Sequence, residues 1–191
     1  MKALGEIGAV KAVRYVAWAV AYHLGYRLLL LSPLRVLWLR VFGAHIGANS
    51  VIMDVRFFNL YRGGMRNLRT GRETFIGDDC LLDMAGQVVL GNQVTLAERV
   101  TVLTHTNVGY ADHPLQRDFP AFVAPVTIGD GSYIGAGAIL LPGVTIGPKT
   151  AVGAGAVVTE DLIGGALAVG VPARIVRMLS PESDLRRATS R

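Results

Sequence analysis

The chain has 191 residues, of which 51% are hydrophobic, and it carries a single cysteine, Cys80. This length suffices for one domain with an appendage, and so apolar a composition excludes a largely disordered chain. One cysteine excludes an intrachain disulfide and a cysteine-rich zinc site, and it favours a reducing compartment such as the cytoplasm.

The formal net charge of +5 is concentrated near the N-terminus. Residues 1–43 contain six basic side chains and one acidic side chain, whereas residues 44–191 contain 13 of each and are neutral overall. Tryptophans, tyrosines and leucines are interleaved with the basic residues, a pattern typical of segments at a membrane interface. A nucleic-acid-binding role is disfavoured, because the basic excess accompanies leucines and tryptophans and the rest of the chain is neutral.

Residues 1–43 are predicted to form two helices rather than one membrane span. Arg14, Arg27 and Arg35 interrupt the apolar run, and Ser32-Pro33 splits it near its middle, whereas a spanning helix needs roughly 20 apolar residues with few charges. The run also lacks the small-residue cleavage pattern of a signal peptide. We expect this segment either to contact a membrane surface peripherally or to cap the main domain or another subunit.

A six-residue repeat runs through most of the remaining chain. Aliphatic residues recur at positions 128, 134, 140, 146, 152 and 158, and glycine follows four of them. The same spacing occurs earlier at positions 76, 82 and 88, resumes after a shift of two residues at 90, 96 and 102, and begins weakly at 46 and 52. Neither the helical period of 3.6 nor the strand period of 2 explains this spacing.

Each hexapeptide is predicted to form one short strand and a turn, and three of them to close a triangular coil of 18 residues. The aliphatic side chains stack inward in such a coil, and the glycines allow the turns. The predicted fold is therefore all-β, a parallel β-helix over residues 44–172, with an N-terminal α-helical segment (1–43) and a C-terminal tail (173–191). Residues 104–125 lack the repeat and are predicted to be a loop ejected from the coil.

The stretch APVTIGDGSYIGAGAILLPGVTIGPKTAVGAGAVVTEDL, followed by AVGVPARIVR, resembles the hexapeptide-repeat sugar O-acetyltransferases. That group includes the maltose and galactoside acetyltransferases and the polysaccharide O-acetyltransferases of the colanic acid type. The resemblance covers roughly residues 44–177, and its most specific part is the string PGVTIG…VGAGAVVT…GVPA. It implies a left-handed coil, a homotrimer, and acetyl-CoA bound in the groove between adjacent subunits.

The resemblance implies that His105, directly after VTVLT, is the general base. An imidazole is suited to removing a hydroxyl proton near neutral pH, and backbone N–H groups would stabilise the tetrahedral oxyanion. Relatives usually carry an aspartate immediately after this histidine. Here Thr106 follows, so the sequence assigns no residue to orient His105.

Three further residues are candidates for binding the acceptor. Asp83 stands about where relatives use an asparagine to contact the acceptor sugar, and Asp112 and His113 belong to the ejected loop. Each has a plainer interpretation: Asp83 as a solvent-facing coil residue, and the loop pair as part of a solvated turn.

The candidates for binding acetyl-CoA are Ala136, Ala154, Lys149, Arg174 and Arg177. The resemblance implies that the two alanines line the pantetheine arm, where small residues allow close approach. The three basic residues would pair with the CoA phosphates, because Glu160 stands where many relatives have a lysine. The plainer interpretations are ordinary hexapeptide packing and a solvated charged surface.

The predicted function is acetyl transfer from acetyl-CoA, without a metal, to a sugar hydroxyl of a cell-surface glycan or glycolipid precursor. The enzyme would be a cytoplasmic homotrimer in peripheral contact with the inner face of the cell membrane. The alternatives are an acyl-carrier-protein-dependent long-chain acyltransferase on the same fold and a non-catalytic trimeric scaffold. A zinc carbonic anhydrase is disfavoured, because the four histidines are not spaced to converge on one metal ion.

Overall fold

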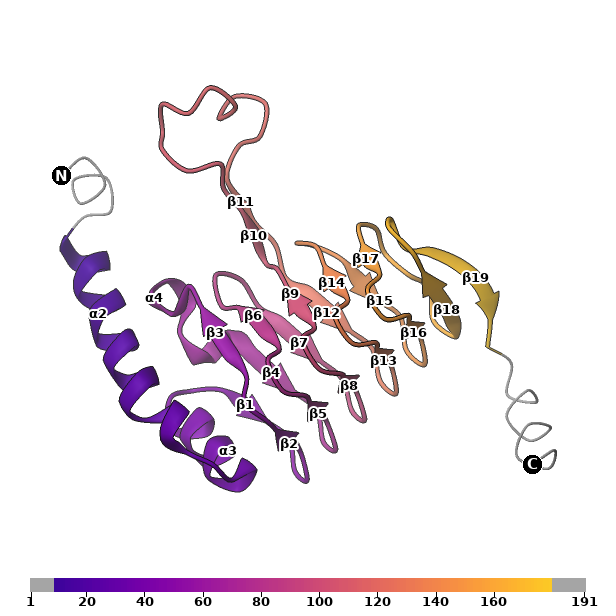
Figure 1. Cartoon of the computed structure of the whole chain (residues 1–191), viewed down its shortest axis with the longest axis horizontal. Coiled ribbons are helices and arrows are strands. Elements are labelled where there is room, and N and C mark those ends of the chain that lie inside the picture. The colour runs from indigo at the N-terminus through magenta and orange to yellow at the C-terminus, as the bar shows by residue number, and fades with distance from the viewer. Residues whose placement is uncertain (1–8, 180–191) are drawn as a thin grey trace.

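The computed structural model describes residues 9–179, which form a three-sided prism of short parallel strands with helices at its N-terminal end (Figure 1). Residues 1–8 and 180–191 lie outside the described residues. They include Lys2 and Glu6 of the basic N-terminal segment and the last twelve residues of the predicted tail.

Each side of the prism is one sheet, and the chain visits the three sheets in turn. The first sheet contains β1 (His45–Ile46), β4 (Leu68–Thr70), β7 (Val88–Leu90), β12 (Val126–Ile128) and β15 (Thr145–Ile146). The second contains β2 (Val51–Ile52), β5 (Phe75–Ile76), β8 (Thr95–Leu96), β13 (Tyr133–Ile134), β16 (Ala151–Val152), β18 (Ala166–Val169) and β19 (Arg174–Met178). The third contains β3 (Arg56–Phe58), β6 (Leu81–Asp83), β9 (Thr101–Val102), β14 (Ile139–Leu140) and β17 (Val157–Val158).

The strand register confirms the predicted coil of 18 residues. Ile128 pairs with Ile146 in the first sheet, Ile134 with Val152 in the second, and Leu140 with Val158 in the third. These repeat positions are all buried, so each coil adds one aliphatic layer to a continuous core. Because each layer is covered only by its neighbours, the fold gains its stability by stacking.

The insertions into the repeat lie at one corner of the prism, where the chain passes from the third sheet to the first. We call it the insertion corner. It contains α4 (Leu60–Gly63) and η2 (Met65–Asn67) after β3, residues 84–87 after β6, and residues 103–125 after β9. The last insertion is the predicted ejected loop. Its base is an antiparallel pair, β10 (His105–Thr106) and β11 (Phe122–Val123), from which the loop projects away from the prism (Figure 1).

The N-terminal segment forms α2 (Ala9–Leu24), η1 (Tyr26–Leu28) and α3 (Ser32–Val41), so the predicted division near Ser32-Pro33 is confirmed. Proline in the first turn suits a helix start, because the amide that it lacks has no intrahelical partner there. Tyr26 and Leu39 are fully buried against the first coil. The hydroxyl of Tyr26 donates to the carbonyl of Met53 at 3.1 Å. The segment therefore caps the β-helix.

The opposite side of this cap is apolar and exposed. In α2 the exposed apolar positions include Val10, Val13, Val16, Val20 and Leu24, which recur every three or four residues and so form one stripe. Leu34, Leu37 and Val41 are exposed at the same spacing in α3. Within residues 9–179, no helix combines the length and the hydropathy needed to cross a membrane.

The C-terminal boundary differs from the prediction. Residues 174–178 were expected to belong to a tail, but they form β19, which pairs antiparallel with β18 and extends the second sheet. The chain reverses at Gly170, whose φ of +97° favours glycine. A single antiparallel strand does not follow the six-residue repeat, so the periodicity gave no signal for it.

Candidate active site

The insertion corner brings together His105 and Asp83. The Nδ1 atom of His105 makes a short contact with the carboxylate of Asp83, which lies one coil below it at the end of β6. Asp83 is fully buried, whereas the imidazole remains about 20% exposed. With Nδ1 directed at a carboxylate, the other ring nitrogen, Nε2, is the one that carries the lone pair in the neutral imidazole, and the side-chain nitrogen of Asn59 lies 3.5 Å from it.

Asn59 completes this cluster from the coil below. Its side-chain nitrogen donates to Asp83 Oδ1 at 2.8 Å and lies 3.4 Å from His105 Nδ1. Asn59 has a φ of +57°, a left-handed conformation that asparagine tolerates better than most residues, and there the chain turns from β3 into α4. The sequence pattern did not predict a role for this residue. Its only signal was a polar side chain directly after the apolar pair Phe57-Phe58.

The backbone holds the Asp83 carboxylate from the other side. The amide of Ala85 donates to Oδ1 and the amide of Thr104 to Oδ2, each at 3.0 Å. Burial raises the pKa of Asp83, but hydrogen bonds from Asn59, His105 and these two amides outweigh it, so the pKa lies below its ordinary value. Asp83 is therefore ionised near neutral pH, beside the ring nitrogen that it orients.

This geometry corrects the interpretation of Asp83 as a solvent-facing residue and disfavours its predicted role in binding an acceptor. The residue does not face solvent, because its exposed fraction is 0%. It is also poorly placed to bind an acceptor sugar, since each oxygen already accepts two hydrogen bonds and a carboxylate has about four acceptor positions. The sequence left His105 without an orienting partner, and Asp83 is the carboxylate that contacts its Nδ1 atom.

Two of the predicted acetyl-CoA residues lie together at the opposite end of the third sheet. Ala136 and Ala154 follow β13 and β16, and the amide of Gly155 donates to the carbonyl of Ala136 at 2.9 Å, which stacks the two turns. Neither alanine amide has a backbone acceptor within the described residues. A Cβ at Gly137 or Gly155 would meet nothing within 4 Å. This corner therefore exposes bare backbone with two free N–H donors.

The three basic candidates are not gathered at one place. Arg174 begins β19, near the end of the third sheet, and forms an exposed ion pair with Glu160 at 3.7 Å. Lys149 lies at the corner between the first and second sheets, and Arg177 lies opposite Leu167 farther along β19. Of the three, Arg174 is the one placed near the bare corner, because Ala173 bonds to Val157 of the third sheet.

Asp112 and His113 lie in the ejected loop. The Nδ1 atom of His113 accepts a hydrogen bond from the amide of Leu115 at 3.1 Å, which is a local turn contact. Asp112 is exposed. The structure does not bring either residue to the pair formed by His105 and Asp83, and their role in binding an acceptor stays a prediction.

Other kinds of catalytic group are not prominent. Burial raises the pKa of the Cys80 thiol to about 11, and its Sγ donates to the carbonyl of Ala97, so this cysteine is a poor nucleophile near pH 7. In the part of the chain between residues 9 and 179, no three His, Cys, Asp or Glu side chains are grouped closely enough to hold a metal ion.

Comparison with known proteins agrees with this architecture. Residues 125–160 match the family model described as bacterial transferase hexapeptide (six repeats). The chain is 31% identical to the galactoside O-acetyltransferase of Escherichia coli over 114 residues, which are 60% of this chain and 55% of that protein. The chain spans just over half the length of the curated relatives that it matches.

Solved structures extend the likeness to the whole prism. The maltose O-acetyltransferase of Clostridium difficile is 30% identical with a TM-score of 0.67, and the match covers 78% of this chain and 76% of that one. A galactoside acetyltransferase in complex with coenzyme A is 26% identical with a TM-score of 0.61, over 80% of this chain and 73% of that one. The chain therefore belongs to the hexapeptide-repeat acetyltransferase family and has its left-handed parallel β-helix.

Proposed function

We propose that the protein transfers an acetyl group from acetyl-CoA to a hydroxyl group of a sugar, with His105 as the general base. The observation that carries this proposal is the contact between His105 Nδ1 and the buried, ionised Asp83. A carboxylate at one ring nitrogen fixes the orientation of the imidazole and leaves the other nitrogen to act on the acceptor.

In the proposed reaction, His105 Nε2 removes the proton from the acceptor hydroxyl as its oxygen attacks the thioester carbonyl. The tetrahedral intermediate collapses with cleavage of the carbon–sulfur bond, and the imidazolium returns its proton to the departing thiolate of CoA. Asp83 stays ionised and stabilises the imidazolium between these two steps. The products are the acetyl ester and CoA, and no covalent enzyme intermediate is needed.

We further propose that the bare corner at Ala136 and Ala154 binds the pantetheine arm of acetyl-CoA. The two free amides suit its carbonyl groups, and the absence of side chains at Gly137 and Gly155 allows close approach. Of the three basic residues, we assign Arg174 to the CoA phosphates, because it is the first residue of β19 and lies next to this corner. Lys149 and Arg177 lie farther from the corner within one subunit, so their role depends on a neighbouring subunit.

The assembly that we propose is a homotrimer. The last strand, β19, exposes Ile175, Val176 and Met178, as expected of a surface that another subunit covers. Light scattering coupled to gel filtration measures the mass directly. A mass three times that of the chain supports the trimer, and a monomeric mass overturns it.

We also propose that the exposed stripe of α2 contacts the inner face of the cell membrane, which places the enzyme beside a glycan or glycolipid acceptor. The support is the apolar stripe together with Lys11 and Arg14 and the absence of acidic residues between positions 9 and 43. Co-sedimentation with anionic vesicles tests it. Val13→Asp with Val20→Asp should abolish binding, whereas Leu115→Asp in the ejected loop should not. Unchanged binding of the double variant overturns the contact.

The decisive experiment for the chemistry is the release of CoA from acetyl-CoA, measured with and without sugar acceptors. His105→Gln should lower the acceptor-dependent kcat about 100-fold or more, because a general base contributes 10²–10⁴-fold. Equal CoA release by the variant would show that His105 is not the base. His45→Gln is the matched control, since that histidine is exposed in β1 of the first coil.

A further inference from the structure

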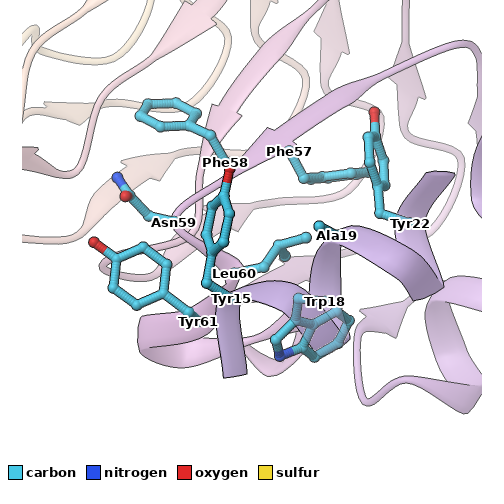
Figure 2. A pocket seen from close by; sticks show the side chains of 9 residues that line it. All are labelled: Tyr15, Trp18, Ala19, Tyr22, Phe57, Phe58, Asn59, Leu60 and Tyr61. Carbon is cyan, nitrogen blue, oxygen red and sulfur yellow. The ribbon is translucent and has the colours of Figure 1, made fainter. Parts of the chain in front are cut away.

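A pocket of about 170 Å³ lies between helix α2 and the turn that joins β3 to α4 (Figure 2). Its walls include Tyr15, Trp18 and Tyr22 on one side and Phe58, Asn59 and Tyr61 on the other. Aromatic walls with a few polar groups are typical of sites for small molecules. The flat rings suit the C–H faces of a pyranose, and the hydroxyls of Tyr15 and Tyr61 and the amide of Asn59 suit its hydroxyl groups.

The pocket adjoins the proposed active site through two of its own lining residues. The Phe58 ring centroid is 6.2 Å from that of His105, and the side-chain nitrogen of Asn59 is 3.4 Å from His105 Nδ1. Both residues line the pocket and also contact the imidazole. A ligand that fills the pocket therefore lies beside the proposed base.

Two exposed arginines adjoin lining tyrosines in the chain, Arg14 next to Tyr15 and Arg62 next to Tyr61. We place them at the rim of the pocket because they contact each other and Tyr61. Arg14 precedes Tyr15 and donates to the carbonyl of Arg62 at 3.2 Å. Arg62 donates from Nε to the hydroxyl of Tyr61 at 3.3 Å, and its guanidinium lies 5.8 Å from the centre of that ring. Over the described range, neither guanidinium has a carboxylate partner.

We propose that this pocket is the acceptor site and that the acceptor is a sugar with a phosphate on its anomeric carbon. This inference rests on the proposed acetyltransferase function. Planar guanidinium groups match phosphate oxygens in charge and geometry, so Arg14 and Arg62 hold the phosphate at the rim. The ring lies against Tyr15 and Tyr61, with one of its hydroxyls directed at His105.

A phosphate in this position occurs both in sugars linked to nucleoside diphosphates and in sugars linked to polyprenyl diphosphates. The two share the chemistry that the rim recognises. The exposed apolar stripe on the outer side of α2 favours the lipid form, because the same helix would then lie at the membrane and wall the pocket.

Binding is measured by calorimetry on the full chain with His105→Gln, which prevents turnover. The probes are galactose, galactose 1-phosphate, uridine diphosphate galactose, and polyprenyl diphosphate galactose in phosphatidylcholine vesicles, with the matching glucose series. We expect the phosphate-bearing forms to bind at least about tenfold more tightly than the free sugars, as charge-assisted hydrogen bonds predict. Lipid vesicles without the sugar give the background for the last probe.

Replacement of both rim arginines, Arg14→Gln with Arg62→Gln, should remove this preference. Arg27→Gln is the matched control, because it removes one charge from the same basic segment, from a side chain paired with Asp54. Tyr15→Ala should weaken free and phosphorylated sugars equally, and Tyr15→Phe, which keeps the ring and loses only the hydroxyl, should weaken both less than Tyr15→Ala does. Equal affinity for free and phosphorylated sugars, no binding of any probe, or a preference that survives the double arginine variant each overturns the proposal.

Acetylation assays on the wild-type protein separate this inference from the proposed function. If free sugars are acetylated as efficiently as their phosphates, the acetyltransferase function stands and the phosphate site is wrong. If phosphorylated sugars bind through the two arginines but no CoA is released with any of them, the site stands and the function is wrong. A lower KM for the polyprenyl form than for the nucleotide form identifies the lipid-linked source.

Discussion

Two corners of the prism differ in the regularity of their turns. At the corner between the second and third sheets, the turns after β13 and β16 have the same length and stack backbone on backbone. At the insertion corner, between the third and first sheets, successive coils carry inserts of different lengths. The first corner offers bare backbone, whereas the second offers Asn59, Asp83 and His105. The repeat forms the coils and their core, whereas the side chains of the proposed active site lie at the corner where the repeat is interrupted.

The regular corner leaves little room for side-chain variation. A Cβ on Gly135 would lie 2.6 Å from the amide nitrogen of Ala154, closer than backbone atoms allow. At the insertion corner, by contrast, individual hydrogen bonds pair the buried polar groups. The hydroxyl of Thr104 donates to the carbonyl of Asp83 at 2.9 Å and accepts from the amide of Gly86 at 2.8 Å. The buried carboxylate of Asp83 is tolerated at this corner because it accepts hydrogen bonds from Asn59 and from the amides of Ala85 and Thr104.

The largest expected effect is a loss of folding stability when a core residue of the coils is truncated. Ile134 is fully buried and stacks between Leu96 and Val152. Ile134→Ala should lower the free energy of unfolding by about 3 kcal/mol, because it removes buried methyl groups and leaves a cavity. Urea denaturation measures this loss.

The same variant should keep the kcat of the folded protein. A large fall in kcat at a temperature where Ile134→Ala is fully folded would contradict the separation of the core from the proposed active site. Val51→Ala, at an exposed position of β2, is the matched control and should change stability by less than about 0.5 kcal/mol.

The second prediction is a loss of activity caused by a substitution at the insertion corner. Asp83→Asn should lower kcat about 100-fold with little change in KM for acetyl-CoA, because an amide no longer fixes the imidazole or stabilises its charged form. Steady-state kinetics of CoA release measure both constants. Asp79→Asn makes the same chemical change at an exposed turn and serves as the control. A kcat equal to that of the wild type would remove Asp83 from the proposed mechanism.

The contrast between the corners also explains what the sequence predicted. Positions such as Ile128, Ile134 and Leu140 repeat because every coil has the same physical need for an inward aliphatic side chain, so the core was readable from spacing alone. His105 was predicted as the base from the resemblance to the hexapeptide-repeat acetyltransferases, because it directly follows a recognisable coil. The ejected loop was found because the repeat stops there and later resumes.

The contact between Asp83 and His105 could not be predicted from the sequence, because it joins residues of different coils and their spacing does not follow the repeat. Asp83 and His105 are 22 residues apart, and Asn59 is 24 residues before Asp83. Neither interval equals the 18-residue coil, since inserts of different length lie between them. The strand β19 was missed for a related reason: antiparallel pairing after Gly170 has no counterpart in the hexapeptide pattern.

The third prediction tests whether the regular corner binds acetyl-CoA. Ala154→Leu should raise KM for acetyl-CoA about tenfold and leave kcat nearly unchanged, because a bulky side chain would block close approach to the bare backbone. Ala48→Leu places the same side chain at an exposed turn of the first coil and is the control. Equal KM values for Ala154→Leu and the wild type would show that the pantetheine arm does not bind at this corner.

The smallest expected effect concerns stability in acid. The pKa of Asp83 is lower in the folded protein than its ordinary value of 3.8, so the ionised carboxylate favours folding. This contribution is fully present above the ordinary pKa and is lost as the pH falls through the lower folded-state pKa. The free energy of unfolding should therefore fall more steeply below about pH 4 in the wild type than in Asp83→Asn.

Urea titrations between about pH 3 and pH 6 measure this difference in slope, and Asp130→Asn provides the comparison. Hydrogen bonds from Asn92 also lower the pKa of Asp130, but that carboxylate is exposed, so solvent screens its interactions. Asp130→Asn should therefore change the slope less than Asp83→Asn does. The reverse order would mean that the hydrogen bonds around Asp83 do not favour its ionised form, and the buried carboxylate would lose its proposed role beside His105.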